Sequence, residues 1–144
     1  MKPLKHASGA RPASRPSFRQ HQITGQFLAR LDQHLTDLRN GVAQHSLEIR
    51  EVAAQLFIHP THLSNTIKEV LGKPACLVYE EKLLQLAKEL LEGPQPVNHI
   101  AFALDYDPSN FTRFFKRFTG ITPRQYRNEL LYRHAAENPE KDTI

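Results

Sequence analysis

The sequence of 144 residues contains a single cysteine and no apolar run as long as a membrane span. One cysteine cannot build a disulfide framework within the chain, and it fits a reducing cytoplasm. A membrane-spanning helix needs about 20 consecutive apolar residues, and the start of the chain lacks the apolar stretch of a signal peptide. We therefore expect a cytoplasmic protein that does not enter a membrane.

Patterns that carry catalysis or hold a cofactor are also missing. The chain has no glycine-rich phosphate loop and no nucleophile elbow. His59 and His62 stand three residues apart, but no cysteine or group of carboxylates nearby completes a set of four metal ligands. Cys76 lies in an apolar run without neighbours that would activate its thiol, which favours a structural role. We expect no enzyme activity, no metal and no cofactor.

Acidic side chains are scarce in two parts of the chain. Residues 1–40 hold seven Lys or Arg against two Asp or Glu, and residues 113–133 hold six against one. Residues 41–112 hold five against nine, so the net charge of +4 is unevenly distributed. Basic surface concentrated in this way suits a polyanion better than an acidic small substrate.

The segment from Pro96 to Arg127 predicts a helix with two different sides. Its phenylalanines recur at the spacing of one helix face: Phe111, Phe114, Phe115 and Phe118. Polar and basic residues have the same spacing on the opposite side: Ser109, Thr112, Arg113 and Lys116. A shorter apolar set precedes them: Val97, Ile100, Ala101 and Leu104. The pattern indicates a helix-turn-helix that enters a DNA major groove, or else a helical hairpin within an all-α core.

Turn and end signals frame this second helix. Asp105 can adopt the left-handed backbone that tight turns often need, and Pro108 suits the first turn of a helix. Gly120 can end the helix, Thr122 can cap the next one, and Pro123 can begin it. We expect this closing helix to run from Thr122 to Tyr132 with Tyr126, Leu130 and Leu131 turned inward.

An internal repeat relates residues 47–72 to this segment at an offset of 48. Ala53 aligns with Ala101, Pro60 with Pro108, and Gly72 with Gly120. A repeat of this kind duplicates a supersecondary unit, here a second helix-turn-helix. The copy is imperfect, because Phe57 occupies the turn position of Asp105, and Asn65 stands where the later copy has Arg113.

The remaining segments complete an all-α fold of about seven helices, with two helix-turn-helix subdomains joined by a long linker helix. We expect a disordered basic arm over 1–21, which contacts phosphates or a minor groove or is merely a solvated tail. The DNA-binding domain spans 22–133, with a first unit at about 22–72, a linker helix over 75–92 and a second unit at about 96–133. The first helix is expected from Ile23 to Asn40 with Gly41 as its stop, and residues 134–144 as a frayed tail.

The sequence resembles the DNA-binding domain of AraC/XylS-type transcription regulators. The motifs that carry the resemblance lie mostly in the second half: Ile100-Ala101, Tyr106, Asp107-Pro108-Ser109-Asn110-Phe111, Arg113, Phe115-Lys116, Gly120, Pro123 and Tyr126-Arg127. The resemblance covers about Gln26 to Leu131. It implies a bacterial protein, associated with the nucleoid when bound, that places two recognition helices in adjacent major grooves of double-stranded DNA.

The resemblance also assigns candidate contacts. Base-reading positions would fall on Thr61, His62, Ser64, Asn65, Ser109, Asn110, Thr112 and Arg113. Phosphate contacts would fall on Lys68, Lys116, Arg117, Arg124 and Arg127. Two units in one chain are compatible with binding as a monomer. Because 40 residues cannot build the sensor domain that many members carry ahead of this one, the chain resembles a stand-alone member or a fragment.

The first unit departs from the family pattern at Asn65 and Ile67, where the family usually has Arg and Phe. Neither turn has the usual glycine. Because the second unit carries more positive charge, we expect it to supply more of the binding energy than the first. An alternative function is a helical interaction module that binds the transcription machinery, such as RNA polymerase, and has only non-specific affinity for DNA.

Overall fold

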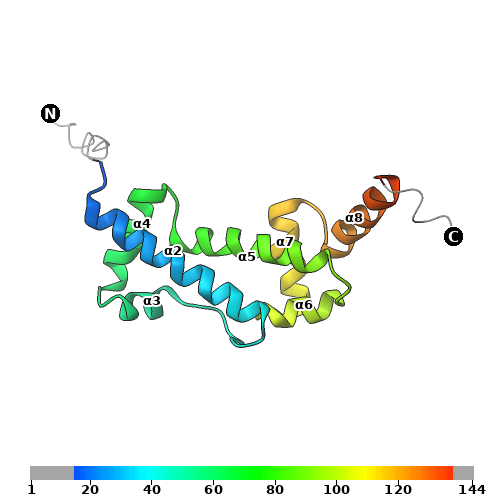
Figure 1. Cartoon of the computed structure of the whole chain (residues 1–144), viewed down its shortest axis with the longest axis horizontal. Helices are drawn as coiled ribbons and strands as arrows, with labels where there is room; N and C mark the ends of the chain where they lie inside the picture. The colour runs from blue at the N-terminus through cyan, green and yellow to red at the C-terminus, as the bar shows by residue number, and fades with distance from the viewer. Residues whose placement is uncertain (1–14, 138–144) are drawn as a thin grey trace. The chain divides into compact units, whose positions relative to one another are not determined.

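The computed structural model describes residues 15–137, and within that range the protein contains helices and no strands (Figure 1). The helices are α2 (Phe18–Arg39), α3 (Ile49–Gln55), α4 (Pro60–Leu71), α5 (Ala75–Leu91), α6 (Val97–Ala103), α7 (Pro108–Thr119) and α8 (Pro123–Glu137). The all-α class, the seven helices and the two helix-turn-helix motifs expected from the sequence are confirmed. None of the helices in the described range is long and apolar enough to cross a bilayer.

The first helix begins earlier than its apolar pattern indicated. Ser17 Oγ accepts a hydrogen bond from the Gln20 backbone N–H at 3.1 Å, and Gln20 Oε1 accepts one from the Ser17 N–H at 2.7 Å. This reciprocal pair is a capping box, which satisfies two amide groups that a helix start otherwise leaves without partners. The expectation of a disordered arm is therefore wrong for Phe18 to His21, and its residues 1–14 lie outside the described range.

The chain divides into two compact units, and residues of α2 contribute to both. Unit 1 comprises the chain up to Arg30 together with Glu48–Ala75, and unit 2 comprises Leu31–Leu47 together with the chain from Cys76 onward. The linker helix expected over 75–92 is α5, and all but its first residue belongs to unit 2. Each unit contains one helix-turn-helix: α3 and α4 in unit 1, and α6 and α7 in unit 2.

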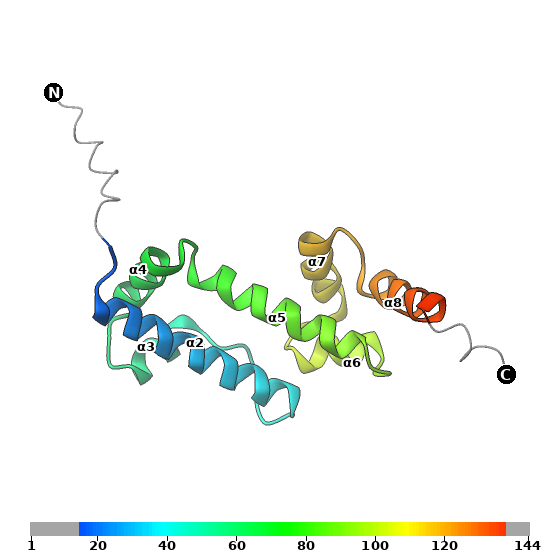
Figure 2. The same ribbon diagram turned by 45° about the horizontal axis from the view of Figure 1, so that its top comes forward.

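Unit 1 buries apolar side chains from three helices. Those at most 2% exposed are Ile23, Phe27, Val52, Ala53, Leu63 and Ile67. Helix α3 packs against α4, and both lie beside the first half of α2 in Figures 1 and 2. Two side-chain hydrogen bonds join α2 to its neighbours: Gln20 to Glu69, and Arg30 Nε to Gln55 Oε1 at 2.8 Å.

Unit 2 has an aromatic core to which α7 contributes most. Phe111, Phe114 and Phe115 are buried, as the spacing predicted, and Phe118 packs partly buried against them. The Tyr106 ring stacks on Phe114 with centroids 5.0 Å apart. The buried leucines of α5 and Leu38 at the end of α2 complete the cluster, together with the partly buried rings of Tyr79, Tyr106 and Tyr126. Helix α5 thus supplies one wall of the core around α7.

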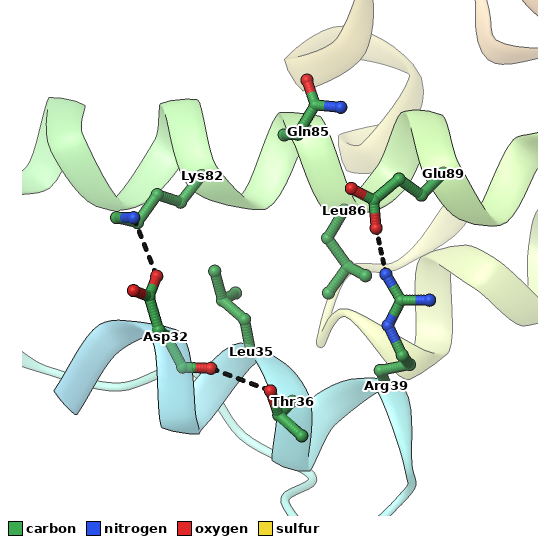
Figure 3. Close-up of a pocket in the computed structure, with 8 residues that line it drawn as sticks. All are labelled: Asp32, Leu35, Thr36, Arg39, Lys82, Gln85, Leu86 and Glu89. Carbon is green, nitrogen blue, oxygen red and sulfur yellow. Dashed lines mark hydrogen bonds and ion pairs between the residues drawn. The ribbon is translucent and has the colours of Figure 1, made fainter. Parts of the chain in front are cut away.

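Within unit 2, two ion pairs flank the contact between α2 and α5 (Figure 3). Lys82 Nζ lies 2.8 Å from Asp32 Oδ1, and Arg39 pairs with Glu89. Leu35 and Leu86 are among the residues that line the hollow of about 220 Å³ between them. Since these charges are largely solvated, each pair is worth about 1 kcal/mol or less. The apolar contact therefore holds the helices together, and the ion pairs align them.

The closing helix α8 begins as predicted and ends later. Thr122 Oγ1 accepts a hydrogen bond from the Gln125 N–H at 3.1 Å, and Gln125 Oε1 accepts one from the Thr122 N–H at 2.8 Å. The helix continues to Glu137, so the expected fraying from His134 is wrong up to that residue. Ala135 and Ala136 favour helix strongly enough to extend it. Leu131, expected to point inward, is 63% exposed.

Candidate nucleic-acid interface

The two helix-turn-helix motifs have the same turn. Phe57 in unit 1 and Asp105 in unit 2 have φ angles of 58° and 67°, in the left-handed region. The residue after each turn position donates its backbone N–H to an alanine carbonyl: Ile58 to Ala53 at 3.0 Å, and Tyr106 to Ala101 at 2.9 Å. These partners are again 48 residues apart, so the sequence repeat is also a repeat of backbone hydrogen bonds.

A side chain caps each recognition helix at its start, and a glycine ends it. Asp107 Oδ1 accepts from the Asn110 N–H at 3.0 Å at the start of α7. His59 does the same for α4 with its ring, whose Nδ1 accepts from the Thr61 N–H at 3.1 Å. Gly72 and Gly120 close the two helices with left-handed backbone, and each donates to the carbonyl of a lysine four residues earlier. His59 therefore serves the helix framework through its Nδ1.

The predicted base-reading residues lie on the outer side of both helices. In α7, Ser109, Asn110 and Arg113 are exposed and Thr112 is half-buried. In α4, Thr61, His62 and Asn65 are exposed and Ser64 is half-buried. The opposite sides of the two helices are buried. Their contact with bases stays a prediction, but each unit presents its own set as one polar surface.

The outer side of α7 is organised by hydrogen bonds. Asn110 Nδ2 donates to Asp107 Oδ2 at 2.9 Å, and Asn110 Oδ1 accepts from Arg113 Nη1 at 2.5 Å. The Thr112 hydroxyl donates to the Pro108 carbonyl at 3.0 Å, which leaves its oxygen as an acceptor. Three charged or amide side chains are therefore linked along the first two turns of the helix. Sequence reasoning identified each position but not this linkage.

The outer side of α4 has no comparable linkage. Within the described residues, no hydrogen bond or ion pair involves the side chains of His62, Ser64 or Asn65. These groups are uncommitted donors and acceptors. The two units thus have the same backbone hydrogen bonds at the turn, but only in α7 are the outward side chains hydrogen-bonded to one another.

Three of the predicted phosphate-contacting residues are free to make that contact. Lys68, Lys116 and Arg124 are exposed. Arg117 is exposed but its Nη2 pairs with Glu80 Oε2 at 2.8 Å, and its guanidinium lies 5.0 Å from the centre of the Phe118 ring. A phosphate at Arg117 would have to compete with a carboxylate.

Arg127 has a structural task that the sequence did not reveal. Its Nε donates to the carbonyl of Leu91, the last residue of α5, at 3.0 Å. Its Nη2 is buried without a hydrogen-bond partner in the described structure. The last carbonyls of a helix lack partners within the helix, and this arginine satisfies one of them. Arg127 therefore serves the end of α5, and its contact with a phosphate stays a prediction.

One further side chain, that of Ser46, was not identified from the sequence. The Ser46 backbone N–H and hydroxyl donate to Asp105 Oδ2 at 2.8 and 3.0 Å, which anchors the loop after α2 to the turn of unit 2. Cys76, for which a structural role was expected, is exposed. No local sequence signal joins Ser46 to Asp105, because 59 residues separate them.

Two partly buried tyrosines in unit 2 have raised pKa values. Burial raises the pKa of Tyr106 to about 12, and the nearby Glu80 carboxylate adds to the rise. Burial also raises the pKa of Tyr79. Within the described residues, no group of three or more His, Cys, Asp or Glu side chains could hold a metal ion.

Comparison with known proteins matches residues 52–129 to the helix-turn-helix domain family. Two uncharacterised HTH-type transcriptional regulators of Bacillus subtilis are similar to this chain: YobQ at 33% identity over 58% of this chain and YtdP at 34% over 60%. The matched regions cover only 36% of YobQ and 11% of YtdP, so this chain corresponds to a part of each.

Solved structures show the same fold. The C-terminal domain of AraT, a response regulator from Geobacillus stearothermophilus, has a TM-score of 0.67 and 28% identity, covering 81% of this chain and 88% of that one. The DNA-binding domain of AdpA, solved in complex with a target DNA, has a TM-score of 0.64 at 18% identity, covering 88% and 98%. The chain belongs to the AraC-type helix-turn-helix family of DNA-binding transcription regulators.

Proposed function

We propose that this chain is a sequence-specific transcription regulator that inserts α4 and α7 into adjacent major grooves of one DNA duplex. The observation that carries the proposal is the repeated unit itself: a tight turn, a capped helix, a buried inner side and a polar outer side, present twice. Such a helix fits the width of the major groove. The structural similarity to AdpA, whose DNA-binding domain was solved in complex with a target DNA, supports binding to double-stranded DNA here.

Arg113 is the strongest candidate for reading a base. It is exposed on the outer side of α7, where its guanidinium keeps donors that are not used by Asn110. An arginine that pairs with guanine through two hydrogen bonds gives about 1–3 kcal/mol of discrimination against other bases. Lys68, Lys116 and Arg124 would contact phosphates, which fix the register and supply much of the affinity.

A selection of binding sites from random duplexes tests the proposal most directly. We expect an asymmetric motif with two half-sites whose centres are about 10 base pairs apart, the spacing of adjacent major grooves. The same selection with an Arg113→Ala variant should lose one conserved position and keep the other half-site. Enrichment of no motif at all, with affinity that depends only on salt, would rule out sequence-specific binding.

Lys116 provides the matched control for a contact that does not read bases. Lys116→Ala should weaken binding to every sequence alike and should reduce the slope of log K against log salt concentration by about 1. Arg113→Ala should instead weaken the selected site much more than random DNA. Equal losses on both DNAs for Arg113→Ala would remove its role as a base reader.

A second candidate function has one observation in its favour. Phe57 is 93% exposed at the turn of unit 1, where an aromatic ring has no partner within the described structure. Aromatic side chains are enriched at protein interfaces. The alternative function is thus that of an interaction module, which binds a protein of the transcription machinery, such as RNA polymerase, through unit 1. Normal DNA selectivity of Phe57→Ser with reduced transcriptional response would support it, and an unchanged response would exclude it.

A further inference from the structure

The start of α7 holds a continuous chain of hydrogen bonds from a carboxylate to a guanidinium. Asp107 accepts from the Asn110 backbone with one oxygen, at 3.0 Å, and from the Asn110 side-chain amide with the other, at 2.9 Å. The carbonyl oxygen of the same amide accepts from Arg113 at 2.5 Å. Each of these residues follows the previous one by three positions, so they lie on one side of the helix. The negative charge at the helix start is thereby connected to the arginine six residues, or nearly two turns, later.

This arrangement uses both ends of the Asn110 amide. An asparagine that reads adenine needs its carbonyl oxygen and its NH2 group together, one for each hydrogen bond to the base. Here the oxygen faces Arg113 and the NH2 group faces Asp107. The orientation of the amide is also the only one that fits these partners, because a carboxylate can only accept and a guanidinium can only donate. A base could use only the second N–H and the second lone pair of an amide that Asp107 and Arg113 already hold in place.

We propose that Asn110 is a positioning residue that holds Arg113 ready for its base, and that it reads no base itself. The inference rests on the proposed function and corrects the base-reading role that the family resemblance gave to Asn110. Arg113 has five N–H donors, and the bond to Asn110 uses one on Nη1. The remaining donors on Nη2 and Nε stay available. The bond to Asn110 gives up part of the rotamer entropy of the Arg113 side chain before DNA arrives.

Unit 1 supplies the natural comparison. The equivalent positions in α4 are His59, His62 and Asn65. His59 caps the helix through the Thr61 N–H, but within the described residues no hydrogen bond joins His62 to Asn65. Of the two recognition helices, α7 has the hydrogen-bonded series of three side chains, and α4 lacks it within the described residues. His62 and Asn65 serve as the matched pair in which no coupling is expected.

The first test needs no DNA. In the free chain, 15N relaxation of the Arg113 side-chain Nε–H measures how restricted the guanidinium is. Asn110→Ala should increase its motion on the picosecond-to-nanosecond timescale, while the backbone relaxation and the helix content stay unchanged. Asp107→Ser keeps a capping hydroxyl but cannot reach the Asn110 NH2 group, so it should give an intermediate increase. Unchanged Arg113 motion in Asn110→Ala would overturn the inference.

The second test is a double-variant cycle on the selected duplex and on duplexes with single base changes. Asn110→Ala should weaken binding about three- to tenfold, the range that the net value of one hydrogen bond gives. Its loss of base preference should fall at the same position as that of Arg113→Ala, and it should vanish in an Arg113→Ala background. The losses from His62→Ala and Asn65→Ala should instead multiply.

Two outcomes separate the inference from the function beneath it. If Asn110→Ala abolishes preference at a different base position, and does so in the Arg113→Ala background too, Asn110 reads that base and the inference fails. If the native chain selects no site at all, the proposed function fails. The relaxation experiment still decides in that case whether Asn110 restrains Arg113.

Discussion

Phe57 and Asp105 occupy equivalent positions in the two turns, but their side chains differ in the contacts that they make. Both have left-handed backbone, which costs an ordinary residue about 1–2 kcal/mol. Asp105 recovers part of this cost, because aspartate tolerates that conformation and its carboxylate accepts two hydrogen bonds from Ser46. Phe57 has an exposed ring and recovers nothing by burial.

The outer sides of the recognition helices differ in the same direction. Unit 2 links Asp107, Asn110 and Arg113, whereas unit 1 leaves its outward polar side chains unlinked within the described residues. Unit 2 also holds the aromatic cluster around Phe115. Both copies of the repeat thus keep the same backbone hydrogen bonds. Only the second copy has side chains that stabilise its core with aromatic contacts and hold its outward residues in place.

The largest effect is expected on the free energy of unfolding, when a core side chain of each unit is truncated. Phe115→Ala should lower the free energy of unfolding by about 3–5 kcal/mol, and Ile67→Ala by about 2–5 kcal/mol, since both side chains are fully buried. The phenylalanine should cost more, because its ring also contacts Phe111 and Tyr126 at centroid distances of 6.1 and 5.3 Å. Urea denaturation followed by circular dichroism measures both. A loss below about 1 kcal/mol for Phe115→Ala would contradict this core.

The next effect compares the two recognition helices on DNA. Arg113→Ala should cost about 1–3 kcal/mol of binding free energy on the selected site. Asn65→Ala should cost less, since Asn65 is a neutral side chain without prepared partners. Fluorescence anisotropy with both duplexes at one fixed salt concentration gives the two values. A footprint lost more completely with Asn65→Ala than with Arg113→Ala would reverse the assigned importance of the units.

A smaller effect with opposite signs is expected at the two turns. Phe57→Gly should raise the stability of unit 1 by up to about 1 kcal/mol, because glycine adopts left-handed backbone freely. The greater chain entropy of glycine when unfolded offsets part of the gain. Asp105→Gly should lower the stability of unit 2, because it removes the acceptor of both Ser46 bonds. Equal shifts of the same sign would mean that the side chains at the two turns do not matter.

The smallest effect is one of pH and should appear only in unit 2. The pKa of Tyr106 is raised from 10.0 to about 12, so the folded state holds the phenol proton more tightly than the unfolded chain. The stabilisation is present in full below pH 10 and is lost as the pH rises towards 12. Thermal melting at pH 9 and pH 11 measures it, with Tyr106→Phe as the control that should flatten this part of the decline. An equal decline in Tyr106→Phe would show that other groups cause it.

Most of the fold could be predicted from the sequence because it depends on local signals. These signals each act within a few residues: the phenylalanine spacing of α7, the prolines at helix starts and the glycines at helix ends. The proline and glycine signals occur in both copies of the repeat, which supported the same interpretation twice. Helix ends were harder. Ser17 with Gln20 forms a capping box that the polar composition of the arm concealed, and the alanines after His134 extend α8 through a segment that looked too polar.

The candidate site was predictable by position but not by partner. Spacing placed Arg113 and Lys116 on the outer side of α7, and both are exposed. The pairing of Arg127 with the Leu91 carbonyl, and of Arg117 with Glu80, joins residues 36 and 37 positions apart. No periodic pattern encodes such contacts, because they arise only when α5, α7 and α8 pack together. An arginine that serves the framework therefore looks the same in sequence as one that contacts DNA.

The aromatic core of unit 2 has a practical consequence for spectroscopy. The sequence contains no tryptophan, and its four tyrosines are Tyr79, Tyr106, Tyr126 and Tyr132, all within unit 2. Near-ultraviolet absorbance and intrinsic fluorescence thus report almost entirely on that unit. Melting of unit 1 would be nearly silent in these signals while remaining visible in far-ultraviolet dichroism. Two optical probes on an unlabelled sample can accordingly tell whether the two helix-turn-helix units unfold together or one at a time.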